Sequence, residues 1–160
     1  MVALVPWLIF IHVLSAILAF GPTFAFGLYG AQGGREPQHA NFMARANKYV
    51  GDRWVLPIAL TMPISGLLIV WAAGINLLET RWLLLGIVLY VVALSYVLLV
   101  QRPATIKLIE LTSTPPPAGA APGGPPPEVL ATVAKIRRGG MITGLLIVII
   151  VALMVVKPAF

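Results

Sequence analysis

The chain has 160 residues, of which 59% are hydrophobic and 10% charged, and it contains no cysteine. Because a soluble domain carries about a quarter of its residues charged, this composition indicates a protein that is solvated by lipid. The absence of cysteine excludes disulfides, thiolate metal sites and cysteine nucleophiles. The net charge is +6, but almost all of the charges lie between apolar segments, which argues against nucleic acid as a partner.

Four apolar stretches are each close to the roughly 20 apolar residues that cross a bilayer. They cover about residues 3–30, 54–76, 82–101 and 139–157. Tryptophans stand near the ends of these stretches, as interfacial anchors do, at positions 7, 54, 71 and 82. The first stretch has no basic n-region and is too long for a cleaved signal peptide, so we expect it to be retained. The sequence therefore predicts one all-α membrane domain over residues 1–160, a bundle of four transmembrane helices.

Basic residues gather in the segments 31–53 and 102–138, which hold nine of the eleven: Arg35, Arg45, Lys48, Arg53, Arg102, Lys107, Lys135, Arg137 and Arg138. The positive-inside rule then predicts that both segments are cytoplasmic loops and that both termini are extracytoplasmic, in a bacterial inner (cytoplasmic) membrane. Anionic lipid headgroups are the partners expected for Arg35, Arg45, Lys48, Arg137 and Arg138.

The two predicted loops have internal organisation. Residues 37–50 alternate apolar and basic side chains at helical spacing, which predicts a short helix lying on the membrane surface. The segment 115–127 is rich in proline and is expected to be an extended spacer, with a proline-rich ligand for a partner protein as the alternative. Residues 128–138 are expected to be helical and continuous with the fourth span.

His12 is the ionisable residue that lies inside a predicted span. Titratable groups at such depth are costly and usually face the bundle interior. One interpretation is an axial ligand of haem b or of another metal. The other is a neutral histidine that hydrogen-bonds to Thr61, Ser65 or Tyr90 across the bundle.

Small and hydroxyl-bearing residues mark the expected helix-packing faces. They are Ser15, Ala16, Ala19 and Thr23 on the first span, Thr61, Ser65 and Gly66 on the second, and Gly86 on the third. Pro57 and Pro63 are expected to kink the second span and to leave carbonyl groups that neighbouring hydroxyls must satisfy. A structural kink is favoured over a substrate path.

The segment from Trp7 through His12 and Ser15 to Leu18 resembles the first helix of a family of predicted bacterial integral membrane proteins, domain of unknown function family 2269. Leu56-Pro57, the run 65–68 (Ser-Gly-Leu-Leu) and the run 81–83 (Arg-Trp-Leu) resemble the same family. That family is in turn distantly similar to copper-resistance D proteins and to the haem-associated protoporphyrinogen oxidase, which implies haem contact by a histidine in the first helix. Here His12 fills that place, but Phe10 or a neighbour stands where the usual lysine would be.

Paired intramembrane carboxylates, a phosphate loop and an inverted repeat are absent from the sequence. We therefore expect a non-catalytic accessory or structural subunit of a larger inner-membrane complex, respiratory or photosynthetic, or a homo-oligomer. A haem-b-binding redox protein that uses His12 is the alternative, and a small transporter or channel is the third. No catalytic residue and no metal site is predicted, and the chain is more in keeping with a non-enzyme.

Overall fold

The computed structural model describes residues 2–113 and 124–159, and it confirms the predicted all-helical class, with no strand among them. The α-helices are α1 (Val5–Arg35), α2 (Ala40–Val50), α3 (Leu56–Ala73), α4 (Arg81–Tyr96), α5 (Arg102–Ser113) and α6 (Pro127–Val156). Two 3-10 turns, η1 (Val2–Leu4) and η2 (Pro37–His39), and two π-helical turns, η3 (Gly51–Val55) and η4 (Val97–Gln101), connect or extend them.

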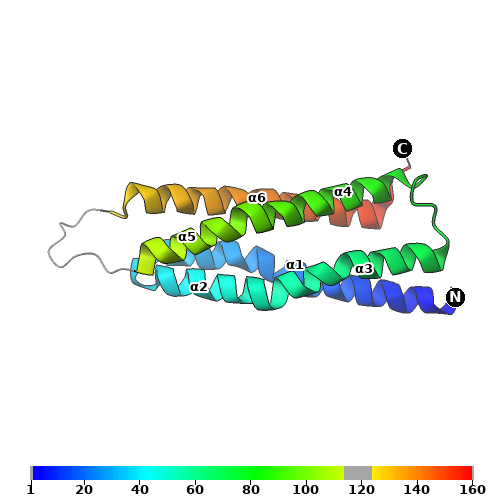
Figure 1. Cartoon of the computed structure of the whole chain (residues 1–160), viewed down its shortest axis with the longest axis horizontal. Helices are drawn as coiled ribbons and strands as arrows, with labels where there is room; N and C mark the ends of the chain where they lie inside the picture. The colour runs from blue at the N-terminus through cyan, green and yellow to red at the C-terminus, as the bar shows by residue number, and fades with distance from the viewer. Residues whose placement is uncertain (1, 114–123, 160) are drawn as a thin grey trace.

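These segments form four long rods that run along one axis (Figure 1). The π-turns η3 and η4 join α2 to α3 and α4 to α5, so the rods cover residues 5–35, 37–73, 81–113 and 127–156, and each is apolar enough to cross a membrane. Both termini and the α3–α4 connection lie at one end of the bundle, here called the terminal end. The opposite end carries residues 31–53, 102–113 and 124–138 of the predicted basic segments and is called the basic end.

The rods are longer than a bilayer requires. At 1.5 Å per residue, the rod over residues 37–73 is about 55 Å long, against a hydrocarbon core of about 30 Å. The segments 31–53 and 102–138, expected as loops, are therefore largely helical where the structure describes them. The predicted continuity of 128–138 with the fourth span is confirmed by α6. Most of the proline-rich spacer 115–127 lies outside the described residues.

The helix expected to lie on the membrane surface, residues 37–50, instead continues through η3 into α3 and packs against α1 and α5. Small residues allow the close approach, because a Cβ on Gly33 would lie 3.4 Å from Cα of Ala40. Two asparagines hold α2 to its neighbours: Asn41 Nδ2 donates to the Ile109 carbonyl at 2.9 Å, and Asn47 Nδ2 donates to the Phe26 carbonyl at 3.3 Å. Tertiary hydrogen bonds thus favour a bundle position over the lipid surface for α2.

The two halves of the bundle are joined differently at its two ends. Towards the terminal end, α1 packs on α3 and α4 packs on α6, and these pairs meet through α1 and α6, while α3 and α4 are not packed against each other. At the basic end α2 packs on α1 and α5, and α5 packs on α6. The backbones of α3 and α4 therefore do not approach each other closely, whereas those of α2 and α5, which continue the same two rods towards the basic end, do.

Pro22 in α1 removes the backbone donor that would otherwise reach the carbonyl of Leu18. The side chain of Trp54 replaces it, because Trp54 Nε1 donates to Leu18 O at 3.2 Å. The carbonyl that Pro22 leaves free in α1 therefore accepts a hydrogen bond from the neighbouring rod.

Candidate functional site

His12 lies on α1, half-buried, and its partner is on α3. The Nδ1 atom of His12 lies 2.7 Å from Oγ of Ser65, so the two side chains share a hydrogen bond. The next residue, Gly66, makes room for the imidazole, because a Cβ there would lie 3.4 Å from Cε1 of His12. Of the three bonding partners expected for a neutral His12, the structure thus selects Ser65.

Ser65 is held in place by its own helix as well. Its side chain is 7% exposed, and Oγ also lies 3.1 Å from the carbonyl oxygen of Met62 and 3.2 Å from that of Thr61. A hydroxyl that is buried and shared in this way fits a contact between helices better than a nucleophile, which must be reachable by a substrate. The pair His12–Ser65 is therefore a polar clamp between α1 and α3.

No group of three or more histidine, cysteine, aspartate or glutamate side chains is placed to hold a metal among residues 2–113 and 124–159. His39, the other histidine, lies in η2 at the basic end, far along the bundle from His12. Haem ligation by His12 stays a prediction.

The residues of α1 that are predicted to pack against other helices are buried or half-buried. Ala19 is 0% exposed, Thr23 Oγ1 donates to the Ala19 carbonyl at 3.2 Å, and Ser15 and Ala16 are half-buried. The small-residue face of α1 therefore serves packing inside this bundle.

Two further members of that set lie on α3 and α4. Thr61 is exposed and donates to the carbonyl of its own helix at Ile58, 2.7 Å away. Gly86 is buried against α6, because a Cβ there would lie 2.5 Å from the terminal methyl of Met154. Gly86 thus permits the close approach of α4 and α6.

Pro63 lies at the point where α3 is hydrogen-bonded to α4. It removes the backbone donor for the carbonyl of Ala59, and the Tyr90 hydroxyl on α4 donates to this oxygen at 2.5 Å. The sequence predicts that a neighbouring hydroxyl satisfies a carbonyl freed by proline, and here the Tyr90 hydroxyl does so. This bond links α3 and α4, whose backbones do not approach each other closely.

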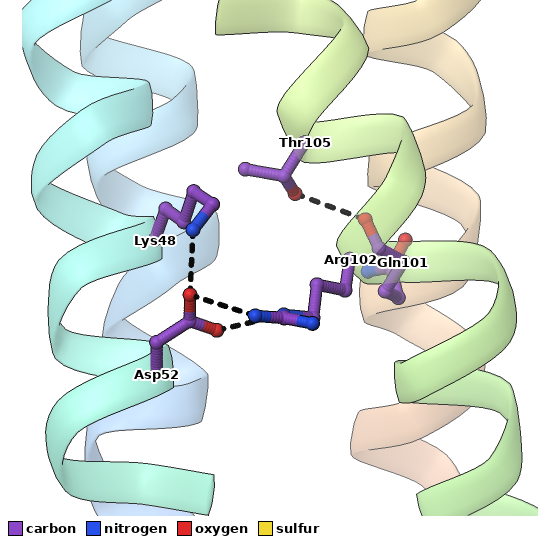
Figure 2. Close-up of polar contacts among 5 residues, drawn as sticks. All are labelled: Lys48, Asp52, Gln101, Arg102 and Thr105. Atoms are coloured by element: carbon purple, nitrogen blue, oxygen red, sulfur yellow. Dashed lines mark hydrogen bonds and ion pairs between the residues drawn. The ribbon is translucent and has the colours of Figure 1, made fainter.

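The largest polar site was not foreseen from the sequence, and it lies at the two π-turns. Asp52 in η3 accepts hydrogen bonds from Lys48 and Arg102 (Figure 2). Lys48 Nζ is 2.6 Å from Oδ2, Arg102 Nε is 3.0 Å from Oδ1, and Arg102 Nη2 is 3.3 Å from Oδ2. These three residues, called the Asp52 cluster, tie the α2–α3 rod to the α4–α5 rod.

Electrostatics within the Asp52 cluster favour the charged forms. The hydrogen bond from Arg102 is the main cause that holds the pKa of the Asp52 carboxyl below its ordinary value; burial opposes it, and Lys48 adds to it. The same contact raises the pKa of Arg102. Because both groups stay ionised around neutral pH, the contact between the rods is an ion pair.

Prolines are the sequence signal that could have located this site. η3 ends two residues before Pro57, and η4 ends two residues before Pro103. A proline interrupts the regular helical ladder, and π-turns are a usual accommodation that often occurs at functional positions. The two interruptions stand at the same level of adjacent rods, which sequence spacing by itself does not reveal.

Gln101 connects η4 to α6. Its Nε2 donates to the Ile136 carbonyl at 3.2 Å, and Thr105 Oγ1 donates to the Gln101 carbonyl at 3.0 Å (Figure 2). Gly139 allows this arrangement, since a Cβ at that position would collide with the Gln101 amide. The Gln101 contact thus extends the polar layer of the Asp52 cluster to the fourth rod.

Four long apolar rods, joined by polar contacts between helices, define a multi-pass integral membrane protein. The chain belongs to the family described as predicted integral membrane protein (DUF2269), which matches residues 6–158. The family resemblance seen in the sequence is thereby confirmed, whereas the more distant similarity to haem-associated proteins stays a prediction. No curated protein and no solved structure matches the chain.

Proposed function

We propose that this protein is a non-catalytic membrane subunit that acts by assembly, either with itself or within a larger complex of the bacterial inner membrane. The observation that carries the proposal is the use of its polar side chains. In the described spans, His12, Ser65, Tyr90 and Trp54 each bond to another helix. Polar groups committed to helix packing support a structural role rather than a reaction centre or a substrate path.

The separation between the backbones of α3 and α4 supports assembly. α3 and α4 are neighbours along the chain, yet they are not packed against each other, and the Tyr90 hydroxyl bridges them. Association of helices in a bilayer depends on packing, so a membrane helix from a second chain gains contacts by lying against the exposed apolar faces of α3 and α4. The small-residue face of α1, in contrast, is occupied by the bundle itself.

Site-directed cross-linking tests this proposal cleanly because the chain has no cysteine. Single cysteines at the exposed positions Ile64 on α3 and Val92 on α4 are expected to form cross-links to a second chain in native membranes. Ile17→Cys on α1, which is also exposed, is the matched control and is expected to remain uncross-linked. A uniform monomer at all three positions, together with a monomeric mass in mild detergent, contradicts the proposal.

We also infer that the basic end faces the cytoplasm and that both termini lie outside. The support is the charge distribution, because the basic end holds nine of the eleven basic residues and the terminal end holds Arg81 and Lys157. In intact cells, a membrane-impermeant maleimide is expected to label Glu79→Cys at the terminal end and to leave Gln38→Cys at the basic end unlabelled until the cells are opened. The reverse labelling pattern contradicts this orientation.

A further inference from the structure

We propose that the basic end carries a specific site for one anionic phospholipid, between α2 and α5, in which Arg53 holds the headgroup phosphate and Arg45 lies farther out along the same groove. The site consists of two shallow grooves that share Tyr49 and Arg53. The proposal goes beyond the assembly role above and does not depend on it.

The level of the site follows from the uncharged runs. The second apolar run begins at Trp54, directly after Arg53, and the third ends at Gln101, directly before Arg102. The Asp52–Arg102 ion pair brings these two boundaries side by side, so they mark one edge of the hydrocarbon layer. Beyond that edge, the headgroup layer is about 5–8 Å thick. Arg53 therefore stands at the depth where lipid phosphates lie.

The first groove has a volume of about 530 Å³ and lies between α2 with η3 and α5. It is lined by Arg45, Lys48, Tyr49, Asp52, Arg53, Ile106, Ile109 and Glu110. Arg45 is eight residues from Arg53, about 12 Å along the rod, so the groove extends from the hydrocarbon edge through the headgroup layer.

The charges in this groove are not equivalent. Lys48 is engaged by Asp52, 2.6 Å away, although the sequence had suggested that it meets lipid headgroups. Among the described residues, Arg45 and Arg53 have no carboxylate within ion-pair distance, and both are exposed. An arginine fork binds phosphate oxygens in a bidentate way. The Asp52 cluster thus leaves two arginines on one groove to meet an anion.

The second groove has a volume of about 460 Å³ and lies on the other side of the shared pair Tyr49 and Arg53. Apart from those two residues it is lined by the uncharged residues Pro22, Val50 and Trp54. A basic groove next to an apolar groove, with an arginine between them, matches an amphiphile whose phosphate meets Arg53 and whose acyl chain covers Trp54. This match favours a membrane lipid over a free phosphate.

Quenching of Trp54 measures occupancy of the site directly. Trp54 lines the second groove, whereas Trp7, Trp71 and Trp82 belong to the parts of α1, α3 and α4 at the terminal end. The full-length protein in detergent is titrated with phosphatidylglycerol that carries bromine on its acyl chains, and the part of the quenching that disappears in Trp54→Phe reports the site. Phosphatidylcholine with the same brominated chains and glycerol 3-phosphate are the comparison ligands.

We expect phosphatidylglycerol to quench Trp54 at lower concentration than phosphatidylcholine does. Because a basic residue near an anionic surface contributes about fivefold in affinity, Arg53→Gln is expected to weaken binding about fivefold, and Arg45→Gln with Arg53→Gln about 25-fold. Arg138→Gln is the matched control, since Arg138 directly precedes the fourth apolar run but does not line either groove. It is expected to leave the affinity unchanged.

Three results overturn the proposal. Equal affinity for phosphatidylcholine removes the requirement for an anion, and an equal loss in Arg138→Gln shows a general surface charge effect. Displacement of the lipid by glycerol 3-phosphate at similar concentration identifies a site for free phosphate. Neither arginine makes an ion pair in the described chain, so the variants should fold, and an unchanged helical circular dichroism spectrum checks this.

Discussion

Replacement of Ala19 by leucine is expected to lower the free energy of unfolding by about 1–3 kcal/mol, because the larger side chain overpacks a filled interface. Ala19 is 0% exposed, and its backbone carbonyl also accepts the Thr23 hydroxyl. In lipid, close packing rather than burial from water holds helices together, so the loss of a close approach is felt directly. The measurement is unfolding in mixed detergent micelles, followed by circular dichroism.

Ala152→Leu provides the matched control for this substitution. Ala152 lies on α6 within the apolar run and is exposed, so a leucine there meets lipid or detergent. Its effect is expected to stay within about 0.5 kcal/mol. If both substitutions destabilise the protein equally, Ala19 does not lie at a packed interface and the arrangement of α1 is wrong.

Removal of the Tyr90 hydroxyl is the second large effect that we expect. Tyr90→Phe leaves the Ala59 carbonyl without a donor inside the apolar layer, because Pro63 supplies no backbone N–H to it. Hydrogen bonds between membrane helices contribute about 0.6 kcal/mol on average and up to about 1.7 kcal/mol. The short 2.5 Å bond from Tyr90 to a carbonyl freed by proline is expected at the upper end of that range. The same unfolding measurement applies.

A double-mutant cycle identifies the cause of the effect. Pro63→Ala restores a backbone donor to the Ala59 carbonyl, so in that background Tyr90→Phe is expected to lose most of its effect. Tyr29→Phe, at an exposed tyrosine on α1, is the control for removal of a hydroxyl and is expected to be neutral. An equal cost of Tyr90→Phe with and without Pro63 shows that the tyrosine acts by packing and not through the freed carbonyl.

Prediction from the sequence was strongest where a property depends on a single segment. The four apolar runs correspond to four rods, and α6 continues from Glu128 into the fourth span as expected. Prediction was weaker for residues 37–50, because amphipathic spacing is the same for a helix on a membrane surface and for one packed in a bundle. The contacts of Asn41 and Asn47 with α5 and α1 decide between the two, and their partners are distant in sequence.

The candidate sites divide in the same way. His12 was identified from its type and depth, and its possible partners were limited to three, but the packing of α1 on α3 selects Ser65. The Asp52 cluster was missed because Asp52 and Arg102 are fifty positions apart, although Asp52 is the single aspartate of the chain. Whether Asp52 and Arg102 come into contact depends on how each rod is rotated about its own axis, and the π-turns set this rotation.

The sequence by itself determined that this protein is a four-span integral membrane protein, because the length and apolarity of a segment decide whether it crosses a bilayer. Only the tertiary structure decided that the basic segments continue the helices, that the small-residue face of α1 is used internally, and that the Asp52 cluster ties two rods together while the backbones of α3 and α4 remain apart. The physical reason is that apolarity is a property of one segment, whereas a polar contact between helices depends on the rotation and depth of both.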